Sequence, residues 1–186
     1  MSTVIYPSPV FGPVQSRRLG VSLGVNLLPA DGKVCSFDCI YCECGLNAQR
    51  RPKSGLPAIE ELEAALERTL QKMQEDGRLP DVITFAGNGE PTMHPRFPEA
   101  VDCAIRLRDR FCPEAKISVL SNSTRIHKPE VREALMRVDN NILKLDSAFD
   151  ATVQLMNKPQ GSYTVARTVE LLKAFEGELI VQTMFL

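Results

Sequence analysis

The sequence lacks a long apolar run, a secretory leader and a strong net charge. No segment reaches the roughly 18 consecutive apolar residues that a membrane-spanning helix needs. The N-terminus shows no basic stretch followed by an apolar one, so no secretory signal is predicted. The 22 basic and 23 acidic residues give a formal net charge of −1, which excludes a general electrostatic attraction to nucleic acid but not a local basic patch. We therefore expect a cytoplasmic protein, in a reducing compartment and away from the membrane.

Internal repeats and low-complexity segments are also missing. The 186 residues are 44% hydrophobic and 24% charged, which is the composition of a folded globular protein. This length fits one domain and is short for two. We expect one core domain over residues 1–186, with residues 1–18 as an N-terminal extension.

Strand-like and helix-like patterns alternate along the chain. The predicted strands cover 19–29, 82–86, 116–121, 141–147 and 178–186. The predicted helices cover 57–76, 97–111, 128–138 and 163–176. Strict alternation predicts an α/β fold with a parallel sheet and right-handed crossovers. In such sheets, ligands bind beside the carboxyl ends of the strands.

The last predicted strand is apolar and nothing follows it. An unpaired apolar edge promotes aggregation. We expect either that the natural polypeptide continues past Leu186 or that a partner covers this edge, and we favour the first. On that expectation the sequence is C-terminally truncated, and the closing strand and the C-terminal region lie beyond it.

Four of the six cysteines fall between Cys35 and Cys44. Cys35, Cys39 and Cys42 have the spacing C-x3-C-x2-C, and they lie in a loop that we expect to span 30–56. Thiolates hold iron–sulfur clusters, and a cubane held only by protein needs four of them. Three thiolates leave one iron open for a substrate or cofactor. We interpret Cys44 as a bystander because a chain so tight after Cys42 would not reach the opposite corner of the cubane.

Other cysteine chemistries fit this spacing less well. A disulfide framework spreads its cysteines along the chain, and a structural zinc site uses two C-x2-C pairs where only one is present. A ferredoxin has C-x2-C-x2-C-x3-C followed by proline. A redox pair of Cys39 and Cys42 would leave Cys35 unexplained. Cys103 and Cys112 lie on or near a predicted amphipathic helix, so we expect them to be buried thiols.

The run from Cys35 to Cys42, with Tyr41 as the aromatic residue in C-x3-C-x-aromatic-C, resembles the signature of the radical S-adenosylmethionine (radical SAM) superfamily. The resemblance implies a 4Fe–4S cluster held by Cys35, Cys39 and Cys42, with its open iron chelated by S-adenosylmethionine. It also implies an oxidoreductase-type enzyme, in which one electron from a reductant such as flavodoxin or ferredoxin cleaves the cofactor to a 5′-deoxyadenosyl radical. That radical takes hydrogen from substrate. The implied fold is a TIM-barrel-like partial (β/α) barrel, with five of the superfamily's six parallel strands visible. Tyr41 would pack beside the adenine.

Residues 87–91, Gly-Asn-Gly-Glu-Pro, resemble the superfamily's Gly-Gly-Glu-Pro motif. The resemblance implies that Asn88, Gly89, Glu90 and Pro91 bind the cofactor, with Glu90 as an acceptor for its amino group. Asn88 stands where the family has glycine, and asparagine tolerates the left-handed backbone such a turn requires.

Asn122, Asp146 and Ser147 follow predicted strands, where the superfamily often places contacts to the ribose and carboxylate of the cofactor. The alternative is that these polar residues cap turns. Strand alternation places Lys144 and Asp146 on one face.

His94 and the pair Arg17-Arg18 have two interpretations each. His94 precedes a proline at a helix entrance, which favours a structural role over titration near the site. The two arginines precede a strand, which favours solvent exposure over an anion clamp.

Residues 11–26, with the later motifs, narrow the resemblance to the Fe–S oxidoreductase group related to tRNA wyosine-base synthases. The extra tRNA-contacting and cluster-binding parts of true wyosine synthases are not found, and the near-neutral charge does not favour a large RNA footprint. A tRNA base, a protein partner and a small molecule all stay open as substrates. The alternatives to an enzyme are an Fe–S electron-transfer or cluster-carrier module and a zinc-stabilised binding module.

Overall fold

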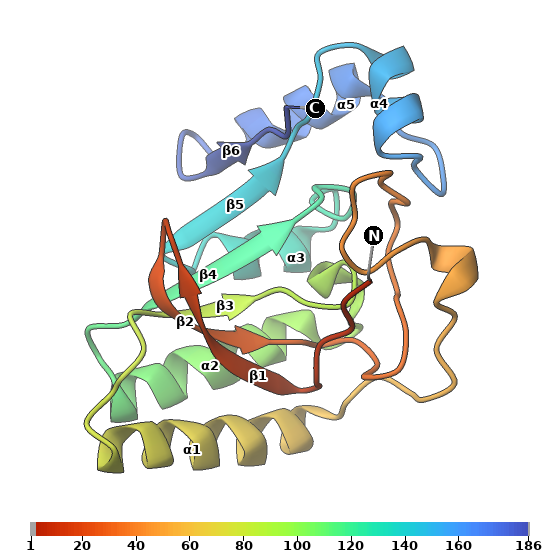
Figure 1. Cartoon of the computed structure of the whole chain (residues 1–186). Coiled ribbons are helices and arrows are strands. Elements are labelled where there is room, and N and C mark those ends of the chain that lie inside the picture. The colour runs from red at the N-terminus through yellow and green to blue at the C-terminus, as the bar shows by residue number, and fades with distance from the viewer. Residues whose placement is uncertain (1–2, 186) are drawn as a thin grey trace.

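A single sheet of six strands organises the computed structural model, which describes residues 3–185 (Figure 1). Its strands are β1 (Val10–Ser16), β2 (Gly20–Val25), β3 (Val82–Phe85), β4 (Lys116–Ser121), β5 (Asn140–Lys144) and β6 (Ile180–Gln182). They lie in chain order; β2 to β6 are parallel neighbours, and β1 is antiparallel to β2. The sheet does not close, so the mixed α/β fold is the predicted partial barrel.

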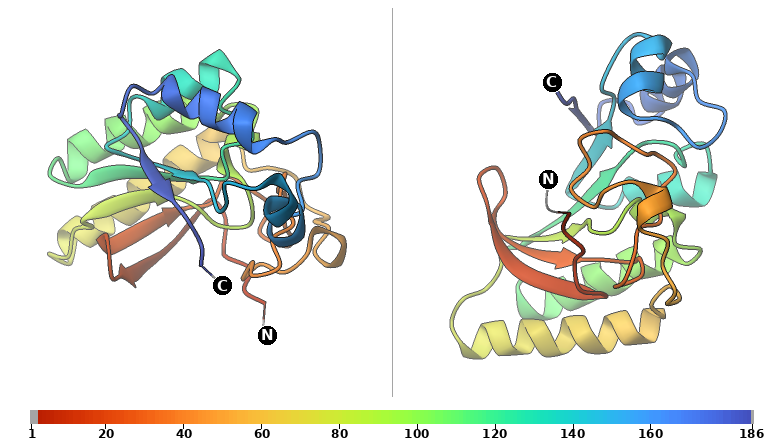
Figure 2. Two further views of the ribbon diagram at one scale, coloured as in Figure 1. Left: turned by 90° about the horizontal axis from the view of Figure 1, so that it is seen from above. Right: turned by 45° about the vertical axis from the view of Figure 1, so that its right-hand side comes forward.

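Helices cover one face of this sheet, except that the fourth helix lies at the carboxyl ends of the strands, beside the loop that carries the cysteines (Figures 1 and 2). They are α1 (Ile59–Glu75), α2 (Phe97–Phe111), α3 (Pro129–Leu135), α4 (Asp150–Met156) and α5 (Val165–Lys173). Short 3-10 helices, η1 and η2, cover Asn47–Gln49 and Pro91–Met93. In α1, Leu62, Leu66 and Leu70 recur at helical spacing and are fully buried, so one apolar stripe packs into the core. Between β3 and α2, Phe85 and Phe97 meet edge-on with ring centroids 6.1 Å apart.

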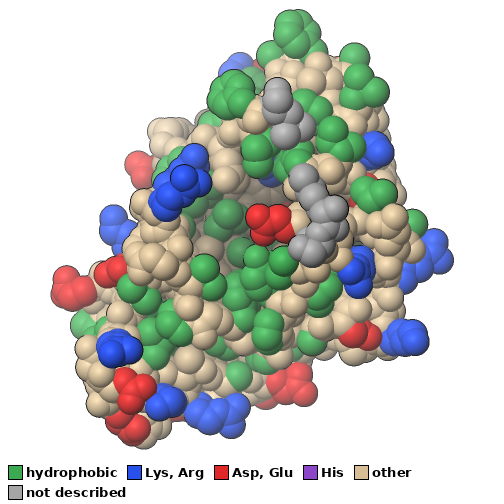
Figure 3. All heavy atoms as spheres, viewed as in Figure 1, with side chains coloured by type: hydrophobic (Ala, Val, Ile, Leu, Met, Phe, Trp, Pro, Cys, Tyr) green, Lys and Arg blue, Asp and Glu red, His purple; other side chains and the backbone are tan. Residues whose placement is uncertain are grey.

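The loop that carries the cysteines lies at the carboxyl ends of the parallel strands, where the arrows of β3, β4 and β5 end in Figure 1. The opposite face of the sheet from the helices is hollowed, and hydrophobic side chains gather around this hollow (Figure 3). The fold therefore brings the loop and the strand ends together, as the parallel topology predicts.

Each of the nine predicted helices and strands has a counterpart in the structure, but two strands are much shorter than predicted. β2 ends at Val25 instead of residue 29, and β6 covers only Ile180–Gln182 of the predicted 178–186, whose last residue lies outside the described residues. Four further elements were not predicted: β1, α4 and the 3-10 helices η1 and η2. β1 lies within the predicted extension 1–18 but joins the sheet. Its middle residues are exposed and include Gly12 and Pro13, so the strand shows no alternating apolar pattern. α4 is seven residues long and buries only Val153, which is too little for a helical period to be recognised.

Both edges of the sheet differ from its interior. β6 is only three residues long, and its Ile180 and Val181 are about half exposed.

Over residues 3–185, none of the helices combines the length and the apolar character needed to cross a membrane.

Candidate functional site

Three cysteines line one cavity of about 260 Å³ at the carboxyl ends of β3, β4 and β5. Several predicted site residues from separate parts of the chain share this lining: Cys35, Cys39, Tyr41, Cys42, Gly89, Glu90 and Asn122. Lys144 and Gln182 also line it. The structure therefore brings the cysteine loop and the Gly-Asn-Gly-Glu-Pro loop to one place.

A backbone bridge between Val34 and Gly89 joins these two loops. The Val34 N–H donates to the Asn88 carbonyl over 2.9 Å, and the Glu90 N–H donates to the Val34 carbonyl over 3.0 Å. Gly89 has φ +132°, and a Cβ there would overlap the Val34 carbonyl oxygen. Only glycine fits this close approach of two backbones.

The other side of the cysteine loop is bound to the end of α4. The Asp38 N–H donates to the Asn157 carbonyl over 2.8 Å, and the Ile40 N–H donates to the Met156 carbonyl over 2.9 Å. The Gln160 N–H donates in return to the Ser36 carbonyl over 2.8 Å. The loop is thus fixed from both sides by backbone hydrogen bonds.

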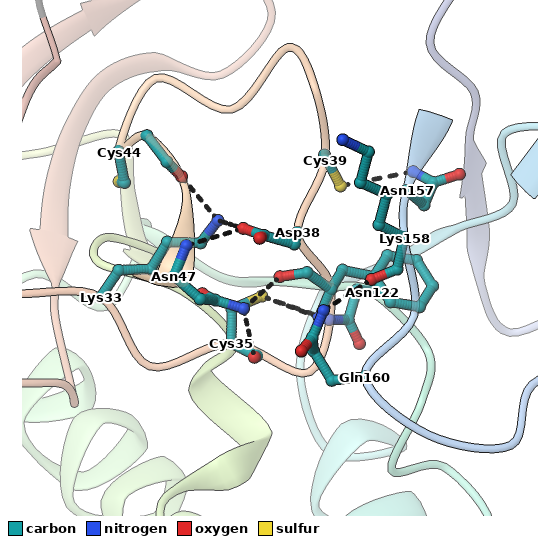
Figure 4. A network of polar contacts seen from close by, with 12 residues as sticks. Lys33, Cys35, Asp38, Cys39, Cys44, Asn47, Asn122, Asn157, Lys158 and Gln160 are labelled. Atoms are coloured by element: carbon teal, nitrogen blue, oxygen red, sulfur yellow. Dashed lines mark hydrogen bonds and ion pairs between the residues drawn. The ribbon is translucent and has the colours of Figure 1, made fainter. Parts of the chain in front are cut away.

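An ion pair between the buried Lys33 and the partly exposed Asp38 fixes the loop from within (Figure 4). The Lys33 ammonium donates to the Gly45 carbonyl over 2.8 Å and lies 3.3 Å from the Asp38 carboxylate. Asp38 also accepts the Asn47 N–H over 2.8 Å, and the Asn47 amide donates to the carbonyls of Cys35 and Phe37. These hydrogen bonds join residues 33–38, at the start of the loop, to Gly45 and Asn47 further along it.

Each of the three cavity cysteines has a different polar environment. The amide nitrogen of Asn122 lies 3.5 Å from the Cys35 sulfur, and that of Asn157 lies 3.4 Å from the Cys39 sulfur (Figure 4). Burial and the negative charge of Glu90 raise the pKa of the Cys35 thiol to about 12. The adjacent Cys44 side chain, and the Lys33 ammonium nearby, lower the pKa of the Cys42 thiol to about 6.

Glu90 is a buried carboxyl whose oxygens accept from two loops. Oε1 accepts from the Thr92 hydroxyl over 2.6 Å and the Ser121 hydroxyl over 2.8 Å. Oε2 accepts the Asn122 N–H over 2.6 Å. Burial nevertheless raises the pKa of Glu90. This carboxyl ties the loop after β3 to the end of β4 at the cavity wall.

A second carboxyl, Asp146, gathers donors beyond β5. It accepts from the Tyr41 hydroxyl, from the Asn157 amide over 2.6 Å and from the Met184 N–H over 3.0 Å. Lys144 lies 3.4 Å from the same carboxylate, as its predicted shared face requires, and 5.4 Å from the Tyr41 ring centroid. Burial opposes ionisation here, but the hydrogen bonds from Tyr41 and Asn157 lower the pKa of Asp146.

Other predicted residues lie next to the cavity rather than in its lining. The Asn88 amide donates to the carbonyls of Tyr6 and Pro29, each over 2.8 Å. Pro91 begins η2, and Asp146 reaches the site through Tyr41 and Asn157. The Ser147 hydroxyl accepts the Phe149 N–H over 3.1 Å, as the turn-capping alternative predicts.

His94, the arginine pair and the remaining cysteines fall outside the cavity lining. The His94 ring bonds the Pro57 carbonyl over 3.0 Å, which agrees with its structural interpretation. Arg17 and Arg18 are exposed in the β1–β2 turn. Cys103 and Cys112 are buried, as predicted. Cys44 is buried with its sulfur 3.4 Å from the Gly87 carbonyl.

Sequence analysis missed two residues of this site, Lys33 and Asn157. Lys33 precedes the first cysteine by two positions, and nothing in its neighbourhood indicated that its charge would be buried. Asn157 follows the unpredicted α4, so its contact with Cys39, distant in sequence, had no signal.

The donor set fits an iron–sulfur cluster. Thiolates are the usual ligands of such clusters, and three thiols face one cavity. No three His, Cys, Asp or Glu side chains within residues 3–185 are grouped so that they could hold a single metal ion. A cubane differs from a single ion because each thiolate binds its own iron.

The chain is similar to one protein family and to several proteins of other organisms over most of its length. The sequence profile of the Radical SAM superfamily matches residues 31–186. The UPF0026 protein MJ1312 of Methanocaldococcus jannaschii is 33% identical over 181 residues, covering 95% of this chain and 53% of that protein. A UPF0026 protein of Helicobacter pylori strain J99 is 32% identical over 182 residues, covering 95% and 56%. The chain thus spans little more than half the length of these relatives.

Solved structures share the fold at lower sequence identity. A structure of TYW1 with a bound lysine–pyruvate adduct superposes with a TM-score of 0.53 and 15% identity, covering 87% of this chain and 54% of that one. A structure of anSMEcpe with bound AdoMet superposes with a TM-score of 0.56 and 20% identity, covering 86% and 43%. Both similarities concern the arrangement of helices and strands.

Proposed function

Because this chain belongs to the Radical SAM superfamily, we propose that it is the core of an enzyme that reductively cleaves S-adenosylmethionine. The family implies a 4Fe–4S cluster and S-adenosylmethionine as cofactors. The observation that carries the proposal is the meeting of Cys35, Cys39 and Cys42 at one cavity, beside the loop of Gly89 and Glu90. In this proposal residues 1–186 are one core domain and 30–56 are its cluster loop.

Cys35, Cys39 and Cys42 would hold the cluster, and the Gly-Asn-Gly-Glu-Pro loop would bind the cofactor. When bound, these groups supply the electron and the 5′-deoxyadenosyl radical that removes hydrogen from substrate. The chain's own residues would position the cofactor and shield it from water. The Val34–Gly89 bridge fixes the two loops against each other, which pre-organises the cavity before the cofactor arrives.

Glu90 and Asp146 have separate roles in this arrangement. Glu90 fixes the ends of β3 and β4 through its bonds to Thr92, Ser121 and Asn122, and its charge faces the cavity as an attraction for the cofactor's ammonium. Asp146 holds the Tyr41 hydroxyl, which fixes the aromatic ring beside the place proposed for adenine.

Phe37 and Leu120 contribute apolar surface to the same lining. Apolar walls around a reactive intermediate exclude water and limit side reactions. We further propose an external electron donor such as flavodoxin or ferredoxin, because each reductive cleavage consumes one electron that the cluster must regain. In this proposal the hydrogen donor is a tRNA base, a protein or a small molecule. Because the chain spans little more than half the length of its relatives, we propose that the recognition of this donor belongs to the whole protein.

The test is anaerobic reconstitution with iron and sulfide, followed by dithionite and S-adenosylmethionine. We expect a brown protein whose reduced-cluster EPR signal changes on addition of the cofactor, with release of 5′-deoxyadenosine. Cys39→Ala is the control that should abolish both the colour and the product. Preferential uptake of zinc, or iron fully ligated by four cysteine sulfurs, would falsify the proposal. A cluster whose signal ignores the cofactor would instead indicate an electron-transfer module.

A further inference from the structure

Two buried asparagine amides, from different parts of the chain, each point a nitrogen at a cysteine sulfur of the cavity. Asn122 follows β4 and approaches Cys35; Asn157 follows α4 and approaches Cys39 (Figure 4). These pairs are separated by 87 and 118 residues along the chain. The fold alone creates both contacts.

The orientation of the Asn122 amide is set by its oxygen. Oδ1 accepts the Thr124 N–H over 3.1 Å and the Thr124 hydroxyl over 2.7 Å. Only an oxygen accepts in this way, so the NH2 group must face the opposite side. There it lies 2.9 Å from the Ser36 hydroxyl and 3.5 Å from the Cys35 sulfur.

The orientation of the Asn157 amide is set by Asp146. That carboxylate receives donors from Tyr41, Asn157, Met184 and Lys144 and therefore acts only as an acceptor. The amide nitrogen of Asn157 lies 2.6 Å from it, 2.9 Å from the Tyr41 hydroxyl and 3.4 Å from the Cys39 sulfur. The two N–H groups of this amide therefore face the Asp146 carboxylate, the Tyr41 hydroxyl and the Cys39 sulfur, and one hydrogen is shared between two of these acceptors.

The backbone holds Asn157 in this place independently of its side chain. The Asp38 N–H donates to the Asn157 carbonyl, and the Ile40 N–H donates to the Met156 carbonyl. Both donors flank Cys39. The amide and the sulfur are therefore carried on two segments that cannot separate without breaking backbone bonds.

A hydrogen bond to a cluster sulfur changes the energy of adding an electron. The reduced cluster carries one more negative charge, and N–H donors near its sulfurs stabilise that charge. We propose, resting on the function proposed above, that Asn122 and Asn157 are positioning residues. They donate to the cluster-bound sulfurs of Cys35 and Cys39 and raise the reduction potential of the cluster.

The experiment is an EPR-monitored redox titration of the reconstituted full chain. Asn157→Leu and Asn122→Leu each remove the NH2 donor at similar volume and add no charge beside the cluster. Each variant should shift the reduction equilibrium by about tenfold against the reduced state. For a one-electron couple this is a potential lower by about 59 mV.

The matched control is Asn141→Leu, which replaces a buried asparagine of β5 that bonds the Glu178 carbonyl and is not part of the cavity lining. Its potential should equal that of the wild type. Asn157→Gln, which retains an NH2 donor, should recover part of the shift. Loaded variants whose potentials equal the wild-type value would overturn the inference.

If Asn157→Leu does not fold or holds no cluster, the inference is tested on the wild-type protein instead. Chain labelled with 15N at asparagine should show 15N coupling to the reduced cluster in pulsed EPR, and absence of coupling would overturn the inference. Failure of the proposed function is recognised separately in the wild-type chain, which would then hold no cluster to titrate, or a cluster whose EPR signal does not change when S-adenosylmethionine is added.

Discussion

Most buried polar side chains around the cavity have hydrogen-bond or ion-pair partners. Glu90 is fully buried, yet it accepts from Thr92, Ser121 and Asn122. Lys33 is buried but lies against Asp38 and the Gly45 carbonyl. Buried polar groups that are paired in this way specify one loop conformation, and removal of a single partner costs more than the bond itself contributed.

Cys44 should be dispensable for iron binding. Its sulfur is directed to the Gly87 carbonyl and it is not part of the cavity lining. Cys44→Ala should therefore keep the iron and sulfide content of the reconstituted wild type, with a stability loss of about 1 kcal/mol. The measurement is iron and sulfide analysis after anaerobic reconstitution. Cys42→Ala is the comparison and should lose the cluster; a bleached Cys44→Ala protein would reject the three-cysteine site.

His94 should make the folded state sensitive to mild acid. Burial lowers its pKa below the ordinary value of 6.5, and its ring bonds the Pro57 carbonyl and the Arg96 N–H as a neutral imidazole. The unfolded chain binds the proton more readily, so the stability from His94 is complete above about pH 6.5 and is lost as the pH falls toward the folded pKa.

Urea unfolding at pH 7.5 and pH 5.5 measures this effect. His94→Gln keeps a donor for the Pro57 carbonyl but does not titrate. Its stability should change less between the two pH values than that of the wild type, by up to about 1.4 kcal/mol per pH unit. Equal pH dependence in both proteins would show that His94 does not contribute.

At the scale of elements, the sequence allowed a correct prediction wherever a period or a spacing was long enough to be recognised. α1 and α2 have apolar stripes over 17 and 15 residues, and the parallel strands are short apolar runs between them. The cysteine spacing placed three thiols on one loop. The contribution of α4 could not be predicted, because a seven-residue helix with one buried residue has no period and its bonds to the loop are made by backbone.

Gly89 should be essential to the junction between the cysteine loop and the loop after β3. Its φ of +132° is unfavourable for other residues, and a Cβ there would also overlap the Val34 carbonyl. Gly89→Ala should lower the free energy of unfolding by about 3 kcal/mol, because strain adds to displaced backbone. Denaturant unfolding gives this value directly.

Gly77 provides the control for the strain alone. It also has a positive φ, +65°, but a Cβ there would meet nothing within 4 Å. Gly77→Ala should cost only about 1 kcal/mol. If both alanine variants lost the same stability, the Val34 contact would have no energetic importance.

At the scale of the whole molecule, the sheet ends in two different edges. β1 is antiparallel to β2 and largely exposed. β6 pairs with β5 and leaves Val181 52% exposed. Edge strands with exposed apolar residues pair readily with other chains.

The 186-residue chain should therefore self-associate through β6. Val181→Lys places a charge on this edge and should raise the concentration for half-association about tenfold, or ~1.4 kcal/mol. Light scattering after gel filtration measures it. Leu155→Lys removes a still more exposed apolar side chain, 73% exposed, from α4 and should have a smaller effect. Equal effects of the two lysines would indicate general hydrophobic adhesion instead of strand pairing.

Within residues 3–185, β1 and β6 are the two ends of the sheet and are not paired with each other. A closed barrel admits only what passes through its mouth, whereas a wall missing on one side can be approached laterally. A single reactive group on a large polymer can enter from the flank while the bulk of the polymer stays outside. Within residues 3–185, the sheet itself therefore leaves the flank of the cavity uncovered, and a polymer approaching from that side would have to present only its reactive group.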